Sequence, residues 1–513
     1  MSASTGTTEP LNLRELLEQR TVQTPDKVFL FSESDGRRYT YKEFDGAVNR
    51  AAHLLASRGV AKSDRVSLLM PNSPEYIIAY FACFKLGAVA GPVNSLLKPQ
   101  ELSYVIANSE AKALVLHSEF RAQIDAVQKE LPDLQHVLEF DDEARATAEF
   151  RDAGALTNTS IERDDEAIII YTSGTTGKPK GCLLTHGNLI ANARQIAGWL
   201  GFTERDRLLT VMPLFHMNAV SVTTMTPLYA GASTVVSPKF SASRFWRIIS
   251  GYEVTSFGSV ATMLARLLSA YPEGVPEGLK TDQLRFAMCG SAPVPAEIMR
   301  SFEETFKCLV IEGYGLSEST CRSTFNPPDE RRRPGSCGMP IGNEMKIVDE
   351  EDREVAEGEL GEVVLRGENI LKGYYKNPAA TTEAFRNGWF HTGDIGYRDA
   401  DGFFYIVDRK SDMVIRGGEN IYPREIDEVL YTHPAVAAAA TIGVPDAVYG
   451  EEVAAFVVLK EGAEVTAEEI ISFCRERLAD YKCPKSVRFI AEIPKGPTGK
   501  LLKRELARQY AQG

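Results

Sequence analysis

Residues 171–181 read YTSGTTGKPKG, and the interpretation of the whole chain begins from this stretch. Its glycines let backbone N–H groups turn toward an anion, while its hydroxyl side chains add donors and its lysines add positive charge. The spacing differs from the common phosphate loop, because only two residues separate Gly174 from Gly177 and Pro179 follows Lys178. Such dense donor chemistry disfavours a plain surface turn, so the stretch predicts a phosphate-binding loop of another kind.

The loop lies within alternating strand-like and helix-like segments. An apolar run precedes it and predicts a strand, and the run 185–200 after it is helix-like. Thr40 and Glu43 form a capping box, and the helical segment that opens at Pro74 closes at Gly87. Further short apolar runs predict strands: RVSLLM, AKALVLH, RLLTVM, STVV and LRFAMCG. This alternation predicts a large layered α/β domain whose strands are mostly parallel.

The composition and the predicted secondary structure change after about residue 340. Short alternating strands rich in Gly and Asp predict a β-rich section, and roughly the last hundred residues predict a compact α+β unit. We therefore expect an N-terminal domain over 1–408, a hinge at 409–411 and a mobile C-terminal domain over 412–513.

Composition excludes several functions. The 513 residues are 44% hydrophobic and 25% charged, with a net charge of −13, which argues against a nucleic-acid or anionic-membrane binder. The eight cysteines include no C-x-x-C pair, so reduced thiols are expected rather than a zinc site or disulfides. The longest apolar stretch is interrupted by Lys85 and Gly87, so no transmembrane segment is predicted, and a cytoplasmic location is expected. The oligomeric state stays open, with a homodimer as one outcome.

Four further residues carry chemistry in turns. Glu318 in YGLSES could hold Mg²⁺, a cation that combines few protein oxygens with phosphate oxygens. Asp394 in HTGDIG could accept from two ribose hydroxyls, and Arg409 in VDRKSD supplies a cation. Lys500 follows a Thr-Gly turn near the end of the chain. Each signal is weak alone, because a charged residue in a turn is more often solvated.

Taken in order, six motifs resemble the adenylate-forming superfamily of acyl-CoA synthetases, carrier-domain adenylating enzymes and luciferases. They are YTSGTTGKPKG, MPLFHMN, GSAPVP, YGLSE, GELGEVVLRGENILKGYY and WFHTGD with DRKSDMVIRGGENIYPREI. The resemblance runs almost end to end, and GGENIYP looks like the acyl-CoA synthetase branch. It implies that a carboxylic acid and ATP form an acyl-adenylate and pyrophosphate, after which the thiol of coenzyme A displaces AMP.

The resemblance also implies roles for individual residues. Lys500 would stabilise the charge that builds at the α-phosphorus, Glu318 would bind Mg²⁺, and Asp394 with Arg409 would bind the ribose. ATP and AMP binding is expected from Thr172, Ser173, Gly174, Thr175, Thr176, Lys180, Ala292, Gly313, Tyr314, Gly315, Ser317, Asp394, Arg409 and Lys500.

The acyl and CoA sites are implied in the same way. The acyl pocket is expected from His216, which we also assign as catalytic, and from Met217, Asn218, Val260 and Gly290. The small and apolar residues along these stretches favour an apolar acid, such as a fatty acid. CoA binding is expected at Gly417, Gly418 and Glu419, and Ser411 occupies the hinge position, where Asp or Lys is usual.

Two alternatives stay open. The enzyme could load an acyl group onto a carrier-protein thiol instead of CoA. A protein of another class, a non-catalytic binder that keeps the fold, is disfavoured because all the polar residues of the motifs are present. The sequence does not name the acid.

Overall fold

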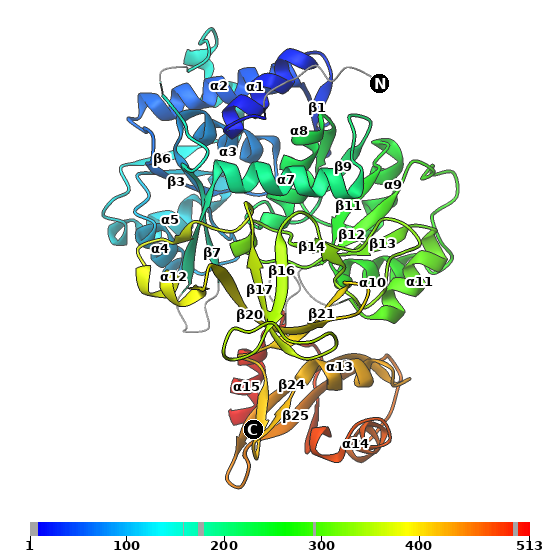
Figure 1. The fold of residues 1–513 in the computed structure, drawn as a ribbon. Helices are drawn as coiled ribbons and strands as arrows, with labels where there is room; N and C mark the ends of the chain where they lie inside the picture. The colour runs from blue at the N-terminus through cyan, green and yellow to red at the C-terminus, as the bar shows by residue number, and fades with distance from the viewer. Residues whose placement is uncertain (1–8, 157–158, 173–178, 291–293, 496–500, 513) are drawn as a thin grey trace.

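The computed structural model describes residues 9–156, 159–172, 179–290, 294–495 and 501–512. They form a large N-terminal α/β domain and a smaller C-terminal domain, which lies below it in Figure 1. The predicted fold class is confirmed.

Two seven-stranded sheets build the large domain. The first runs, in spatial order, through β13 (Leu309–Glu312), β12 (Phe286–Cys289), β11 (Ser256–Ser259), β9 (Arg207–Thr210), β10 (Ser233–Val236), β1 (Val28–Ser32) and β2 (Arg38–Thr40). All neighbours in it are parallel except β1 and β2. Its parallel strands are short and largely buried on both faces, as expected for a parallel sheet between helices, whereas the antiparallel edge strand β2 is partly exposed.

The second sheet contains the strands on either side of the opening loop. Its order is β18 (Gly373–Tyr374), β8 (Lys180–Thr185), β7 (Glu166–Thr172), β4 (Val89–Pro92), β3 (Arg65–Leu69), β5 (Ala113–Leu116) and β6 (His136–Glu139). β7 pairs with β8 in antiparallel register, with Thr172 opposite Lys180. The loop thus joins two strands, and the expected helix, α7 (His186–Leu200), begins only after β8.

Helices pack between and around the sheets. α3 (Pro74–Leu86) is buried along its whole length, and Gly87 ends it at φ 69°, in the left-handed region that glycine adopts at helix ends. The predicted capping box of Thr40 and Glu43 begins α2 (Tyr41–Ser57). The other helices of this domain are α1 (Leu13–Gln23), α4 (Pro99–Asn108), α5 (Arg121–Val127), α6 (Glu143–Ala146), α8 (Thr226–Ala230), α9 (Ala242–Gly251), α10 (Ala261–Ala270), α11 (Ala296–Phe306) and α12 (Pro378–Ala384).

The predicted β-rich section follows. A five-stranded antiparallel sheet contains β16 (Glu344–Val348), β17 (Gly361–Arg366), β19 (Phe385–Arg386), β20 (Trp389–Arg398) and β21 (Phe404–Arg409). A two-stranded sheet of β14 (Thr324–Phe325) and β15 (Met339–Pro340) precedes it. In Figure 1, β20 and β21 lie where the large domain meets the small one.

The C-terminal domain has its own sheet and its own core. Its strands are β22 (Val414–Arg416), β23 (Glu419–Ile421), β24 (Val436–Asp446), β25 (Gly450–Leu459) and β26 (Ser486–Phe489). Its helices are α13 (Pro423–Tyr431), α14 (Ala467–Arg475) and α15 (Lys503–Gln512). The two apolar clusters of this domain contain only residues from Val414 onward, so its packing is separate from that of the large domain.

Candidate active site

A cavity of about 240 Å³ opens where the two domains meet. Its floor is the carboxyl ends of β12 and β13, the edge at which open parallel sheets bind ligands. The large domain lines it with Cys289, Gly290, Val294, Glu312, Gly313, Tyr314, Gly315, Leu316, Gly335, Cys337, Asp394, Ile406, Val407, Asp408 and Arg409. The last part of the chain adds Asp412, Arg424, Asp427, Leu501 and Lys503.

A buried carboxylate lies on one wall of this cavity. Asp394 is 3% exposed and accepts a 2.6 Å hydrogen bond from the Tyr314 hydroxyl. Arg409 Nε lies 3.1 Å from Asp394 Oδ1, because β20 and β21 pair these two residues directly. A cation and a hydroxyl therefore hold the carboxylate, whose orientation is set before any ligand arrives. Burial beside Asp394 also raises the Tyr314 pKa well above its usual value, so the hydroxyl remains a donor.

A second polar group surrounds the ends of β7 and β8. Glu318 belongs to a 3₁₀ turn (Ser317–Ser319), and the Tyr374 hydroxyl donates to its Oε1 at 3.2 Å. The Lys180 ammonium lies 5.3 Å from the centre of the Tyr374 ring, and Thr172 is the strand partner of Lys180. The structure thus brings Glu318 to Thr172 and Lys180, two residues far from it in sequence. Ser317 opens the turn that carries the glutamate.

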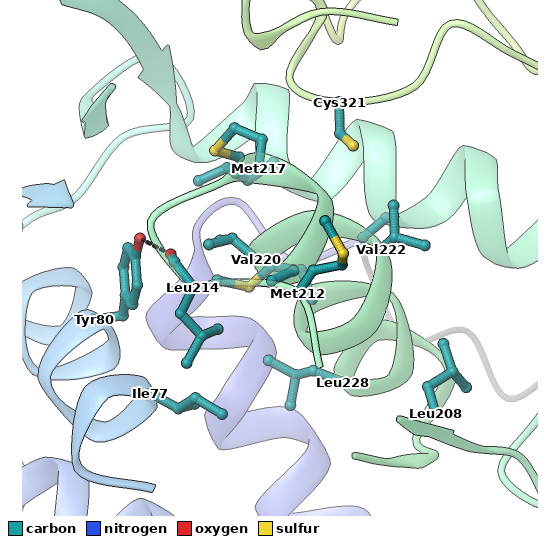
Figure 2. Packing of buried hydrophobic residues seen from close by; sticks show 14 of the residues in the cluster. Ile77, Tyr80, Leu208, Met212, Leu214, Met217, Val220, Val222, Leu228 and Cys321 are labelled. Carbon is teal, nitrogen blue, oxygen red and sulfur yellow. Dashed lines mark hydrogen bonds between the residues drawn. The ribbon is translucent and has the colours of Figure 1, made fainter. Parts of the chain in front are cut away.

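The residues expected at the acyl pocket begin an unusual helix. Asn218–Met225 is a buried π-helix, the helix type that is rare and frequent at functional sites. Met217 and the apolar side chains of the π-helix belong to the cluster drawn in Figure 2, which fixes the position of this segment. Val260 is buried at the start of α10, directly after β11.

Three polar side chains near this segment lack partners among the described residues. They are His216 at Nε2, Asn218 at both amide atoms, and Arg322 at Nε and Nη2. Burial lowers the His216 pKa to about 4, so its imidazole is neutral at pH 7. Gly290, another residue expected at the acyl pocket, lines the cavity and contacts Arg322.

Two thiols line the cavity as well. Cys289 ends β12, and Cys337 lies beside the start of β21. Burial raises the pKa of both thiols to about 12, so both are protonated at neutral pH.

The residues expected to bind CoA lie elsewhere. Gly417 and Gly418 form the turn between β22 and β23 with φ of 60° and 92°, and with Glu419 they are exposed and do not line the cavity. Positive φ at both central residues is the geometry of a tight hairpin turn. Ser411 is exposed between β21 and β22, and its hydroxyl donates to Asp412 at 3.2 Å.

Comparison with known proteins places this geometry in a family. A family model described as AMP-binding enzyme matches residues 17–375, and a model described as AMP-binding enzyme C-terminal domain matches residues 425–500. The chain belongs to the AMP-binding enzyme family. The suspected membership in the adenylate-forming superfamily is confirmed, and the chain is an AMP-forming acid–thiol ligase, a class that uses ATP, Mg²⁺ and coenzyme A.

Relatives of this AMP-binding enzyme extend over almost its full length. A sulfoacetate–CoA ligase of Cupriavidus necator is 37% identical over 500 residues, which cover 96% of this chain and 97% of the relative. The long-chain-fatty-acid–CoA ligase FadD13 of Mycobacterium tuberculosis is 36% identical, covering 98% and 99%. The solved structure of ATP-bound MatB from Rhodopseudomonas palustris matches with a TM-score of 0.90 at 31% identity, covering 98% and 99%.

Some of the expected site residues of this AMP-binding enzyme lie outside the described part of the chain: Ser173, Gly174, Thr175, Thr176, Ala292 and Lys500. Their neighbours in sequence are described and lie at the edges of the site. Thr172 and Lys180 hold the ends of the loop, and Leu501, the residue after Lys500, lines the cavity.

Sequence reasoning missed several polar residues at the site. Tyr374, Arg424, Asp427 and Lys503 are near the cavity or near Glu318 only because distant elements meet there. Arg322 was missed for another reason. It stands among polar residues in STCRSTF, a pattern that reads as a surface turn, yet it is buried.

Glu318 fits a magnesium ion held mainly by phosphate oxygens. Among the residues that the structure describes, no group of three or more His, Cys, Asp or Glu side chains could hold a metal on its own. A single carboxylate beside a hydroxyl and a lysine suits Mg²⁺, which commonly binds through one carboxylate plus substrate phosphates. In the described part of the chain, no helix combines the length and apolar character needed to cross a bilayer.

Proposed function

We propose that this enzyme joins a carboxylic acid to coenzyme A in two half-reactions on one cavity. In the first, the acid carboxylate attacks the α-phosphorus of ATP and releases pyrophosphate. In the second, the CoA thiol attacks the acyl carbon and releases AMP. The observation that supports this most is the held carboxylate Asp394 on a cavity whose floor is glycine-rich.

The nucleotide half of the cavity is suited to AMP. Asp394 would accept both ribose hydroxyls, since Tyr314 and Arg409 already fix its position. Gly313 and Gly315 would leave room for the flat base, because neither presents a side chain to the cavity. Gly315 has no alternative here, since a Cβ on it would lie 2.0 Å from the Cys321 carbonyl oxygen.

The outer phosphates would extend toward β7 and β8. Thr172 and Lys180, with the hydroxyls of the loop between them, would bind the β- and γ-phosphates. Glu318 would hold Mg²⁺, which supplies charge neutralisation for the departing pyrophosphate. Lys500 would stabilise the α-phosphate, and the position of Leu501 in the cavity wall supports this assignment.

The second half-reaction would use another face of the C-terminal domain. We infer that residues 412–513 rotate about 409–411 as a unit, because β21 ends at Arg409, β22 begins at Val414 and the C-terminal core is separate. This rotation would move the Leu501 segment out of the cavity wall and bring the Gly417–Glu419 turn to the cavity. A pantetheine arm would then pass close to the backbone of that turn.

The identity of the carboxylic acid is a separate question from the type of reaction. The names of the relatives include sulfoacetate, long-chain fatty acid, oxalate and feruloyl, so they select no class of acid. The apolar acid that the sequence favours stays a prediction, as do a cytoplasmic location and assembly as a homodimer.

A screen of acids tests the proposed function. Acid-dependent exchange of pyrophosphate into ATP measures the first half-reaction, and CoA-dependent AMP release measures both. We expect at least one acid to support both signals. If an acid supports pyrophosphate exchange but AMP release requires a phosphopantetheinylated carrier instead of CoA, the carrier-loading alternative is identified. No exchange with any acid would overturn the proposal and leave the non-catalytic binder.

A further inference from the structure

Arg322 is a fully buried cation with no acidic partner among the described residues. It is 1% exposed, and its Nη1 donates only to the Gly313 carbonyl oxygen at 3.3 Å, while Nε and Nη2 have no partner. The nearby arginines Arg332 and Arg333 behave differently, because each pairs with a carboxylate. An arginine stays charged in a protein, and burying it unpaired costs several kcal/mol.

The guanidinium lies against the floor of the nucleotide cavity. A Cβ added to Gly290 would lie 2.4 Å from Arg322 Nη1 and 2.7 Å from Nη2, and it would also lie 2.6 Å from the Gly313 carbonyl oxygen, a backbone atom, so glycine is required there. Gly290 itself lines the cavity. The cation is therefore one residue away from the space in which an acyl-adenylate would form.

Asn218 covers the same face of the sheet. Gly258 of β11 is opposite Met288 of β12, and side chains alternate along strands, so Gly258 and Gly290 face the same side. Asn218 Oδ1 would lie 3.0 Å from a Cβ on Gly258, as Arg322 lies over Gly290. The two polar side chains thus occupy neighbouring positions above adjacent strands.

The position of Arg322 is set by its surroundings. Asn192 of α7 donates to the Arg322 carbonyl oxygen at 2.7 Å, and Asn369 donates to the same oxygen at 3.3 Å. The guanidinium carbon lies 5.3 Å from the centre of the Phe325 ring. A cation fixed in this way loses little conformational freedom when it binds an anion.

We propose that Arg322 binds a second acidic group on the acyl substrate, which makes the substrate a short dicarboxylic or sulfocarboxylic acid. This inference rests on the proposed function and replaces the apolar acid that the sequence favours. Carboxylate and sulfonate oxygens both match the paired N–H donors of a guanidinium. Asn218 supplies a further amide donor, and neutral His216 supplies a hydrogen-bonding group without a second positive charge.

The spacing requires a short acid. The reacting carboxylate must reach the α-phosphate in the cavity, while the second anion must reach a guanidinium that touches the cavity floor at Gly290. A long unbranched fatty acid would instead place methylene groups against Arg322 and leave the cation unpaired.

The test compares acids of matched length. AMP release with CoA is measured for propionate, butyrate and pentanoate, for malonate, succinate and glutarate, and for sulfoacetate and 3-sulfopropionate. The wild type is expected to favour one anionic series over monocarboxylates by at least about 100-fold in kcat/KM. The dicarboxylate and sulfonate arms identify which acidic group is used.

Variants assign the preference to the arginine. Arg322→Met is expected to lower kcat/KM for the preferred diacid by about 100-fold or more and to raise it for the monocarboxylate of the same length. Arg322→Lys keeps the charge and is expected to retain part of the preference. Arg285→Met is the matched control, because Arg285 lies at the opposite end of β12 and pairs with Asp206 at 2.8 Å. It is expected to leave the ratio between acids unchanged.

A melting experiment separates a structural role from a binding role. Because the unpaired cation is costly, Arg322→Met without ligand is expected to melt at the wild-type temperature or above it. Adding the preferred diacid to AMP-saturated protein is expected to raise the melting temperature of the wild type above its value with AMP alone, but not that of the variant. A large drop in melting temperature with equal losses for every acid would overturn the inference. Turnover of monocarboxylates alone would also overturn it while the proposed function stands, whereas no turnover with any acid would remove the proposed function itself.

Discussion

Asp394 shows how a single carboxylate is prepared for a ligand. It is nearly inaccessible to solvent, and both the Tyr314 hydroxyl and the Arg409 guanidinium fix its orientation. A carboxylate held in this way avoids the cost of ordering when a ribose binds. The Tyr314 bond is the part of this arrangement that a substitution removes most cleanly, because the ring can stay in place.

Tyr314→Phe is expected to raise the KM for ATP about tenfold, because a hydrogen bond to a charged group contributes about 1.5 kcal/mol or more. Steady-state kinetics over a range of ATP concentrations measures it. Tyr80→Phe is the matched control, since the buried Tyr80 hydroxyl donates to the Leu214 carbonyl oxygen at 2.8 Å (Figure 2), in the packed core. If both variants shift KM equally, the hydroxyl has no special role at the nucleotide.

Lys500→Ala is expected to lower acyl-adenylate formation by roughly 10²–10³, the usual loss for one preorganised electrostatic group. Thioester formation from supplied acyl-adenylate should be largely retained, because no charge then builds at the α-phosphorus. Pyrophosphate exchange and a CoA reaction with synthetic acyl-adenylate measure the two steps. Equal losses in both would remove the assignment.

The sequence allowed a prediction for residues that lie within a recognisable local motif. Asp394 lies between glycines and Glu318 follows a Tyr-Gly turn, and the order of the motifs around them suggested carboxylates that bind a ligand. Arg322 could not be predicted in this way. Its burial depends on Gly290 and Asn192, two residues from distant parts of the chain, and the local pattern carries no information about such contacts.

Among the elements, a strand that the sequence did not predict separates the loop of residues 173–179 from the predicted helix. The run KGCLLT forms β8, and Thr185 caps α7 directly after that strand. The loop therefore joins two antiparallel strands, and in the described part of the chain no helix begins directly after it that could supply a partial positive charge. Under the proposed function, the two lysines and the hydroxyl side chains of this stretch would supply the donors for phosphate themselves.

The β22–β23 turn offers a prediction at the same scale. Gly418→Ala adds a methyl group where no atom lies within 4 Å, at a φ that disfavours other residues. We expect the CoA half-reaction to slow about tenfold or more while pyrophosphate exchange stays within about twofold.

Gly36→Ala is the control for this variant. Gly36 also has positive φ and open space around its Cβ position, but it lies between β1 and β2. If Gly418→Ala leaves both half-reactions unchanged, as the control is expected to do, the turn is not part of the CoA path.

At the scale of the whole molecule, the domain junction contains a carboxyl that titrates near neutrality. Burial raises the pKa of Glu312 to about 7, although the Gly335 N–H donates to it at 2.9 Å. The folded state therefore binds this proton more tightly than the unfolded chain. The stability that the proton contributes is complete below about pH 4.3 and is lost as the pH rises through about 7.

Glu312→Gln is expected to flatten the pH dependence of stability. The wild type should lose about 3 kcal/mol relative to the variant between pH 4.5 and 8, since each pKa unit corresponds to about 1.4 kcal/mol. Melting temperatures across this range measure the difference. The exposed Glu297→Gln serves as the control, and melting curves that stay parallel for wild type and Glu312→Gln would contradict the prediction.

The buried thiols have a consequence for the chemistry of the enzyme. An acyl-adenylate is an electrophile, and Cys289 and Cys337 lie along the cavity in which it would form. With a pKa of about 12, both remain protonated and poorly nucleophilic at neutral pH. In the proposed reaction these protonated thiols would react slowly with the activated acid, which disfavours acylation of the enzyme and favours the CoA thiol as acceptor.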